Sequence, residues 1–122
     1  MLRALLVLLT LLLRLPFVSR FDFVSFDGTY YINQAKALLH GSLSGGAFPI
    51  GYPILIAPLL AVLRNGVLAG ALVSFLAATG SVLLAYAIAR RYVAAWAAFA
   101  AALVLAAAPI FIDASLNTLS ES

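Results

Sequence analysis

The sequence predicts an all-α, polytopic membrane protein with about three transmembrane helices and interfacial helices in a long outer loop. Hydrophobic residue types make up 66% of its 122 residues and charged types only 9%, whereas a soluble domain is about half apolar and about a quarter charged. A globule of this length has too little interior to bury so many apolar side chains. These residues also lie in long uninterrupted runs, which is typical of membrane spans.

Three apolar runs are predicted to cross the membrane, at about 1–18, 66–89 and 92–112. As helices the last two would be about 36 and about 31 Å long, against a hydrocarbon core of about 30 Å. The first run is shorter and carries Arg14, which is costly in a membrane unless it snorkels or faces a polar interior. A fourth run, 53–63, would reach only about 16 Å, so we expect it not to cross.

The positions of the arginines predict the topology. If Arg3 and the pair Arg90–Arg91 are all cytoplasmic, as the positive-inside rule requires, the chain crosses the membrane an even number of times between them. The N-terminus is then cytoplasmic in an inner (plasma) membrane, and the segments 19–65 and 113–122 lie outside. All four acidic residues fall in these outer segments: Asp22, Asp27, Asp113 and Glu121.

Two alternatives stay open for this topology. A chain with four spans would place Arg90–Arg91 outside and would separate Asp27 from Glu121. The N-terminal run could instead be a cleaved signal peptide, although no small-x-small cleavage pattern follows its leucine-rich core.

Small residues recur every four positions along the predicted span 66–89, at Gly66, Gly70 and Ser74. Such a stripe lets another helix approach closely, and it is also a common feature of generic helix packing. The predicted elements include few partner helices for it, and the sequence stops in a polar run. We therefore expect residues 1–122 to be the N-terminal part of a larger membrane domain, inactive alone.

The outer loop 19–65 is expected to contain helices over about 28–40 and 53–63. In the first helix the apolar residues share one face and the polar residues the other; the two sets are Tyr31, Ile32, Ala35, Leu38 and Leu39 against Thr29, Asn33, Lys36 and His40. Such a helix would lie at the membrane surface with its apolar face towards the lipid. Gly41 is expected to end it, and Pro53 suits the first position of the second helix.

Asp27 and Glu121 are the candidate catalytic carboxylates. Asp27 stands where the interfacial helix begins, so it could cap that helix and also orient a hydroxyl and accept its proton. Glu121 follows the last span, where an acid is either solvated or lines a pocket. We expect Asp22 to be a loop residue and Asp113 an acid at the membrane interface.

Other chemistries find little support. Lys36 and Arg20 could contact a lipid phosphate, or they could be ordinary solvated cations. His40 has no second ligand at a metal-binding spacing. Cysteine is absent, which excludes disulfides and thiolate nucleophiles, and neither a nucleophile elbow nor a glycine-rich phosphate loop occurs. The scattered arginines do not favour a nucleic-acid partner.

Taken together and in order, five motifs resemble the opening of GT-C glycosyltransferases of the family 39 type, which comprises protein mannosyltransferases and lipid A aminoarabinose transferases. They are Arg14-Leu-Pro, Asp27-Gly-Thr-Tyr30-Tyr31, Ala35 with Leu38-Leu39-His40-Gly41, Phe48-Pro-Ile-Gly-Tyr-Pro53, and Pro109 through Leu119-Ser120-Glu121. The resemblance covers essentially the whole chain. The sequence departs from the family at Gly28, where many members carry a second acid.

The resemblance implies a membrane enzyme that moves a sugar from a polyprenyl-phosphate donor to an acceptor at the outer face of the membrane. Asp27 would activate the acceptor, and Glu121 would be a second acid in the pocket, acting through a divalent metal in some branches. The implied substrate-binding residues are Tyr30, Tyr31, Lys36 and Arg20. The implied partners are the lipid-linked donor, membrane lipid and the remaining helices of the parent protein. A non-catalytic membrane module, such as a transporter or a polysaccharide-assembly subunit, is the alternative, and it would need no carboxylate pair on one side.

Overall fold

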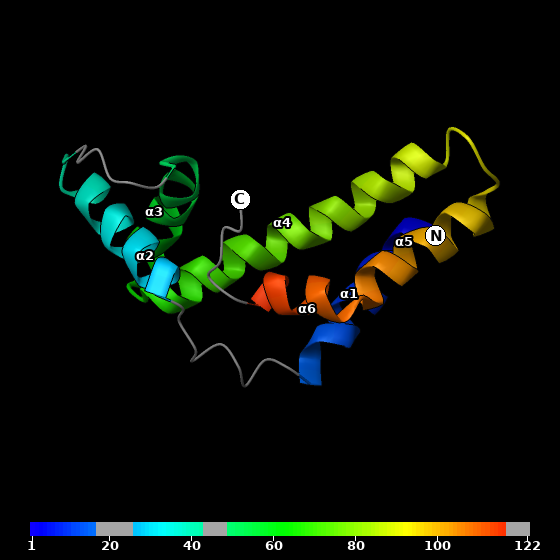
Figure 1. The fold of residues 1–122 in the computed structure, drawn as a ribbon, viewed down its shortest axis with the longest axis horizontal. Helices are drawn as coiled ribbons and strands as arrows, with labels where there is room; N and C mark the ends of the chain where they lie inside the picture. The colour runs from blue at the N-terminus through cyan, green and yellow to red at the C-terminus, as the bar shows by residue number, and fades with distance from the viewer. Residues whose placement is uncertain (17–25, 43–48, 117–122) are drawn as a thin grey trace.

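The computed structural model describes residues 1–16, 26–42 and 49–116, and within these ranges the chain is helical with short turns and no strand (Figure 1). The predicted all-α class is therefore confirmed. These described ranges contain six helices: α1 (Leu2–Arg14), α2 (Phe26–Leu39), α3 (Gly51–Leu63), α4 (Gly66–Ala89), α5 (Ala95–Ala107) and α6 (Pro109–Leu116).

Helix α4 is the central helix of the fold, because it contacts each of the other five described helices. Its N-terminal half packs against α2 and α3, and its C-terminal half packs against α1 and α5. The first packing cluster consists of Tyr31, Ala35, Ile56, Ala57, Leu60, Ala69 and Val73. The second consists of Leu6, Val82, Tyr86, Ala98, Phe99, Ala102 and Ala106.

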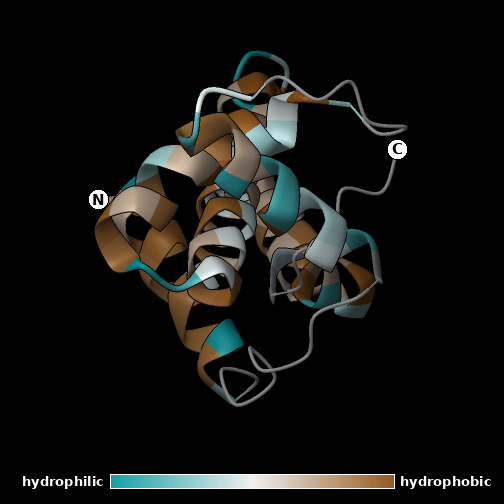
Figure 2. Ribbon diagram, turned by 90° about the vertical axis from the view of Figure 1, so that its left-hand side faces the viewer, coloured by the Kyte–Doolittle hydropathy of each residue, from teal (hydrophilic) through white to brown (hydrophobic). Residues whose placement is uncertain are grey.

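The N-terminus and the turn between α4 and α5 lie at one end of the molecule, and α2 and α3 lie at the other (Figure 1). Helix α6 returns alongside the middle of α4. Most of the ribbon is apolar (Figure 2), and many large apolar side chains remain exposed, among them Val62, Leu76, Leu84, Val104 and Ile110. An apolar surface of this extent is covered in its native setting by lipid or by other protein segments.

One helix of the described chain, Gly66–Ala89, is long and apolar enough to cross a membrane. A second candidate exists only if α5 and α6 are counted together, and they are bent by 65° where they meet. The predicted span over 92–112 is therefore not one continuous helix, and its crossing of the membrane stays a prediction. Pro109 lacks the N–H of a helix interior and its ring clashes with the preceding turn, so it starts a new helix. Helix α1, with 13 residues, is only about 20 Å long, and the three-span topology stays a prediction.

Helix α2 ends as the sequence predicts. Gly41 has a φ of +74°, the left-handed conformation that favours glycine. The N–H of Gly41 donates to the carbonyl of Leu38 (3.0 Å) and the N–H of Ser42 to that of Ala37 (2.9 Å). These two bonds form a Schellman motif, which satisfies carbonyls that would otherwise have no partner at the helix end.

The start of α2 and the setting of its apolar face differ from the prediction. The helix begins at Phe26, so Asp27 lies within its first turn and does not precede the helix. Tyr31, Ile32 and Ala35 are buried, and α2 packs on α3 and α4. These three residues therefore pack against protein and not against lipid, whereas Leu39 of the same face is 46% exposed. The position of α2 at the membrane surface stays a prediction.

Helix α3 runs from Gly51 to Leu63, two residues longer than predicted, with Pro53 in its first turn and Pro58 inside it. It ends at Arg64, which adopts a left-handed conformation with a φ of 55°. The sharp reversal at Arg64 brings α4 back against α3 after a very short connection, and this packing is the base on which α2 rests.

The small residues at the start of α4 are the points where α2 and α3 approach it. A Cβ atom at Gly66 would overlap with Cγ2 of Ile32 on α2. One turn along, the Tyr52 hydroxyl of α3 donates to the carbonyl oxygen of Gly70 (3.1 Å) and forms a hydrogen bond with Oγ of Ser74 (2.6 Å). Helices α2 and α3 therefore supply partners for this stripe, although the sequence led us to expect few.

Candidate functional site

Asp27 is placed at the start of a helix that is firmly docked on its neighbours. Its side chain is half-buried, and it lies in the first turn of α2. Backbone N–H groups of a first helical turn have no partner inside the helix, and the helix dipole stabilises a negative charge there. The backbone at Asp27 thus belongs to a packed helix, and the half-buried side chain remains partly accessible to a polar ligand.

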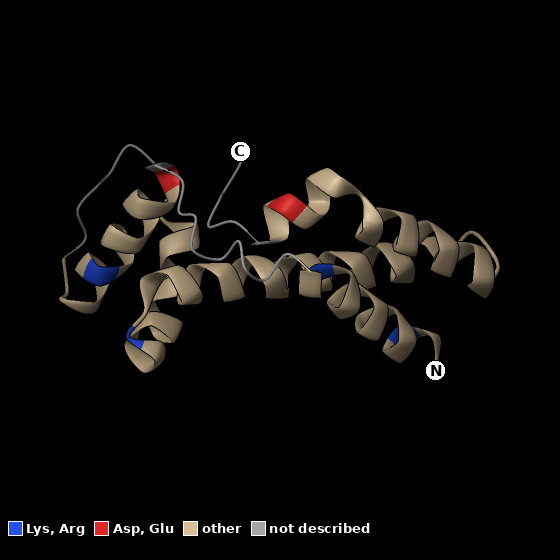
Figure 3. Cartoon of the chain, turned by 90° about the horizontal axis from the view of Figure 1, so that it is seen from below, with Lys and Arg blue, Asp and Glu red and all other residues tan. Residues whose placement is uncertain are grey.

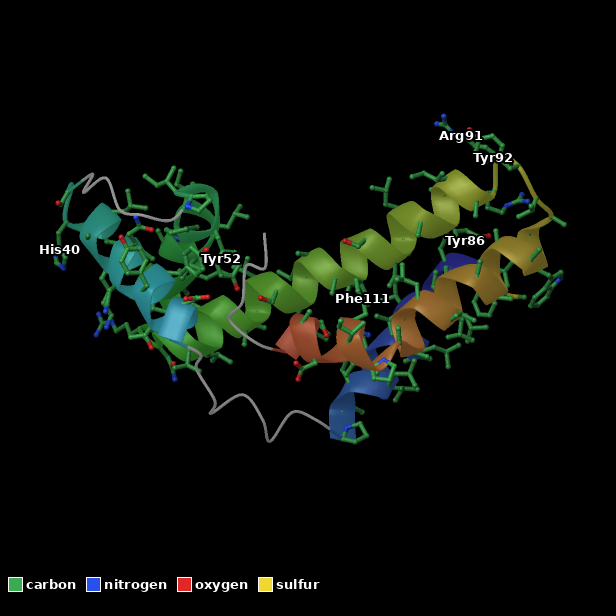
Figure 4. All side chains as sticks on the ribbon, viewed as in Figure 1. His40, Tyr52, Tyr86, Arg91, Tyr92 and Phe111 are labelled. Atoms are coloured by element: carbon green, nitrogen blue, oxygen red, sulfur yellow. The ribbon has the colours of Figure 1, made fainter. Side chains whose placement is uncertain are left out.

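Contacts between three tyrosine rings hold α2 against α3 close to Asp27 in the sequence. Tyr31 is 2% exposed, and its ring makes edge-to-face contacts with Tyr30 (6.5 Å between centroids) and with Tyr52 of α3 (5.2 Å). Tyr52 in turn is bonded to Gly70 and Ser74 of α4, and Figure 4 shows it where α3 faces α4. Burial raises the pKa of the Tyr52 hydroxyl, although the bond to Ser74 acts in the opposite direction.

The other residues predicted to bind substrate are not gathered around Asp27. Lys36 is exposed on α2, but nine positions beyond Asp27, which is about 14 Å along a helix axis. Tyr30 is half-buried and closer to the carboxylate, whereas Tyr31 is enclosed between helices. His40 is exposed at the far end of α2 (Figure 4).

Three of the predicted residues, Arg20, Asp22 and Glu121, lie outside the described residues. The acids that the structure describes are Asp27 and Asp113, one on α2 and one on α6, and Figure 3 shows both on the same edge of the molecule. Asp113 is exposed. The predicted pair of Asp27 and Glu121 thus stays a prediction.

No group of three His, Cys, Asp or Glu residues lies together in ranges 1–16, 26–42 and 49–116. The described residues therefore do not assemble a cluster of carboxylates, which are preferred ligands of divalent metals such as Mg²⁺ and Ca²⁺. We assign no step of the chemistry to a metal.

A buried arginine marks a second polar site, at the end of α1. Arg14 is 1% exposed; its Nε donates to Oγ of Ser115 on α6 (2.8 Å) and its Nη1 to the carbonyl oxygen of Thr10 (2.8 Å). The guanidinium also lies 5.7 Å from the centre of the Phe111 ring, within the range of a cation–π contact. Arg14 thus faces a polar interior, one of the two outcomes that the sequence allows.

Two atoms of this cluster, Nη2 of Arg14 and Oγ1 of Thr10, are buried without a hydrogen-bond partner in the described part of the chain. Burying a charge is costly unless it is paired. The cluster was not predicted, because Ser115 carries no signal in the sequence that links it to Arg14. It ties the exit of α1 to α6, the helix that bears Asp113.

Comparison with known proteins gives one match. The model of a family described as dolichyl-phosphate-mannose-protein mannosyltransferase matches residues 48–121, which is more than half of the chain. The matched range includes α3, α4, α5 and α6, and it begins after Asp27 and α2. No curated protein and no solved structure matches the chain.

Proposed function

Because the chain belongs to the dolichyl-phosphate-mannose-protein mannosyltransferase family, we propose that it is the N-terminal part of a membrane glycosyltransferase. The enzyme moves a sugar from a polyprenyl-phosphate donor to an acceptor at the outer face of the membrane. The match over residues 48–121 is the observation that carries this proposal. The apolar surface and the α4 span support a reaction at a membrane.

The reaction has two chemical requirements. An acceptor hydroxyl attacks the anomeric carbon of the sugar, the bond from that carbon to the phosphate oxygen breaks, and the lipid phosphate leaves with the electron pair. A carboxylate at the acceptor side takes the hydroxyl proton. Cations or N–H groups at the donor side stabilise the charge that develops on the leaving phosphate.

Asp27 meets the first requirement in this proposal. Its helix is anchored through Tyr31 and through Ile32, which lies against Gly66, so the carboxylate keeps its position while the acceptor approaches. Tyr30 is three positions after Asp27 on α2, so in this proposal its side chain contacts a sugar bound next to Asp27. Lys36 and Arg20 are the candidates for the donor phosphate, and Glu121 is the candidate for a second acid in the pocket.

The test is transfer of a labelled sugar from a polyprenyl-phosphate donor by the full-length protein in membranes, at matched expression. Asp27→Asn keeps the size of the side chain and most of its ability to satisfy a helix start. The rate should fall by about 10²- to 10⁴-fold, the usual cost of losing a general base.

Asp113→Asn is the matched control, because Asp113 is the other described acid and is exposed on α6. It should keep nearly the full rate, and Glu121→Gln should fall between the two. An Asp27→Asn enzyme that keeps more than about a third of the wild-type rate, far above the general-base cost, would contradict the role of Asp27. A full-length protein that transfers no sugar would contradict the proposed function itself.

A further inference from the structure

A groove of about 450 Å³ lies between α1 and α4, remote from Asp27. Arg3, Ala4 and Val7 line it from α1, and Leu83, Leu84 and Ala87 line it from α4. Its volume is within the range of about 300 to 1,000 Å³ that is usual for ligand-binding pockets. Neither the fold nor the proposed reaction gives this groove a role.

Along the groove a charged residue is followed by apolar ones, as the charged headgroup of a phospholipid is followed by its acyl chains. Arg3 is in the first turn of α1 and Ala87 in the last turn of α4, so these two residues form the end of the groove that lies nearest the helix termini. Val7 and Leu83 lie one helical turn further in, and apart from Arg3 the lining side chains are apolar. An exposed arginine therefore lies at one end of an otherwise apolar groove, and we call this end the mouth of the groove.

The surroundings of this mouth are typical of a membrane–water interface. Arg90 and Arg91 follow α4 directly and are exposed. Tyr92 and Trp96 are 82% and 66% exposed, and Figure 4 shows Arg91 and Tyr92 at the turn between α4 and α5. Aromatic residues of this kind gather at the level of lipid headgroups, and several arginines together attract anionic lipid.

We propose that this groove binds one anionic phospholipid, with an acyl chain along Val7 and Leu83 and the headgroup phosphate on Arg3. The charge complementarity selects the headgroup, because Arg3 is the charged residue in the lining and a guanidinium matches the geometry of a phosphate. The site is independent of the glycosyltransferase proposal and requires only that the protein lies in a membrane.

The experiment uses the full-length protein in a mild detergent, mixed with equal amounts of phosphatidylglycerol and phosphatidylcholine that carry identical acyl chains. Native mass spectrometry then counts the lipids retained by each protein molecule. The wild type should retain one phosphatidylglycerol in preference to phosphatidylcholine. Arg3→Gln should lower this preference about fivefold, the factor that corresponds to about 1 kcal/mol for one arginine near an anionic headgroup.

Arg91→Gln makes the same change of charge at the same end of the molecule, outside the lining, and should lower the preference less than about twofold, a minor part of the effect of one contacting arginine. Ala87→Phe adds a large side chain to the lining beside Arg3, where the lipid would enter the groove, and should reduce the retention of both lipids. Ala101→Phe, on an exposed position of α5, is the control for added bulk and should retain lipid as the wild type does.

Three results would overturn the proposal. Equal retention of the two lipids by the wild type would mean that no anionic headgroup is recognised. Equal effects of Arg3→Gln and Arg91→Gln would mean that only the overall surface charge attracts lipid. Unchanged retention in Ala87→Phe would mean that another helix of the parent protein or a second copy covers the groove. The helix content by circular dichroism should be the same in all variants.

Discussion

The guanidinium of Arg14 and the hydroxyl of Ser115 join two helices that are 101 positions apart in the chain, at a distance of 2.8 Å between Nε and Oγ. The Ser115 hydroxyl donates a hydrogen bond to the carbonyl oxygen of Ile112 (2.7 Å), so it accepts from α1 and donates within α6. This contact fixes α6 against the end of α1. The charge of Arg14 is thereby hydrogen-bonded, although Nη2 has no partner in the described part of the chain.

We predict that Ser115→Ala destabilises the protein more than Arg14→Met does. The alanine leaves a buried charged donor without its acceptor, at a cost of about 1–3 kcal/mol. The methionine removes the charge itself, and replacing buried charged groups by apolar ones of similar size is often nearly neutral.

The measurement is the free energy of unfolding in mixed micelles, followed by circular dichroism. Ser81→Ala is the control, because Ser81 donates only to the carbonyl oxygen of Ala77 within α4 and is exposed; it should change the free energy by less than about 0.5 kcal/mol. An Arg14→Met protein as unstable as Ser115→Ala would mean that the contact with Phe111 outweighs the burial of the charge.

The second prediction concerns two glycines of α4. Gly66→Ala should destabilise the protein by about 1–3 kcal/mol, since the new methyl group overlaps with Ile32 and a packed interface does not accept extra volume. Gly80→Ala should be neutral or stabilising by up to about 1 kcal/mol, because nothing lies within 4 Å of a Cβ there and alanine is the better helix former.

A second substitution distinguishes the overlap with Ile32 from any other destabilising effect of a methyl group at position 66. Ile32→Ala removes the overlapping Cγ2 atom, so the Gly66→Ala, Ile32→Ala double variant should lose less stability than the sum of the two single changes. Simple additivity in thermal unfolding would show that α2 does not approach Gly66 as described.

The third prediction links Tyr52 to alkaline pH. Because burial raises the pKa of Tyr52 in the folded protein, the folded state favours the neutral hydroxyl. The corresponding stability is fully present below the unfolded pKa of about 10 and is lost as the pH rises through the folded pKa. The free energy of unfolding of the wild type should therefore fall on raising the pH above about 10, and Tyr52→Phe should reduce this fall.

At neutral pH the same variant should lose about 1 kcal/mol, the usual net value of a hydrogen bond, since the bonds to Gly70 and Ser74 are removed while the ring can still pack on Tyr31. Tyr92→Phe is the control, because Tyr92 is 82% exposed, and it should follow the wild type at every pH. If the free energy of unfolding of Tyr52→Phe falls above pH ~10 as steeply as that of the wild type, ionisation of Tyr52 is not the cause of the fall.

The fourth prediction tests the topology, and residues 1–122 contain no cysteine that would itself be labelled. A cysteine at Ser42, an exposed position after α2, should react with a membrane-impermeant maleimide added outside intact cells. A cysteine at Tyr92, beside Arg90 and Arg91, should react only after the membrane is opened, because positive residues stay on the cytoplasmic side. Labelling of position 92 from outside would reverse the proposed orientation.

Local signals in the sequence predicted local structure well. The glycine at position 41 ends α2, and the apolar and polar faces of that helix lie where the periodicity placed them, because both features depend on neighbouring residues. What covers those faces could not be predicted, since it depends on distant segments such as Gly66 and the α3 residue Tyr52. The break at Pro109 was missed because alanine and isoleucine on both sides keep the hydropathy high. The partner of Arg14 was missed because a single serine 101 positions away carries no pattern.

The continuous α4 joins two packing clusters that share no residue, and this has a consequence for hydrogen exchange. Helices α2 and α3 can separate from α4 while α1 and α5 remain in place, so the two ends of the molecule should exchange their amide protons through openings of different free energy. The amides of α4 become fully exchangeable only when both clusters open. They should therefore be the slowest among the described residues, and the longest described helix would also report the stability of the whole.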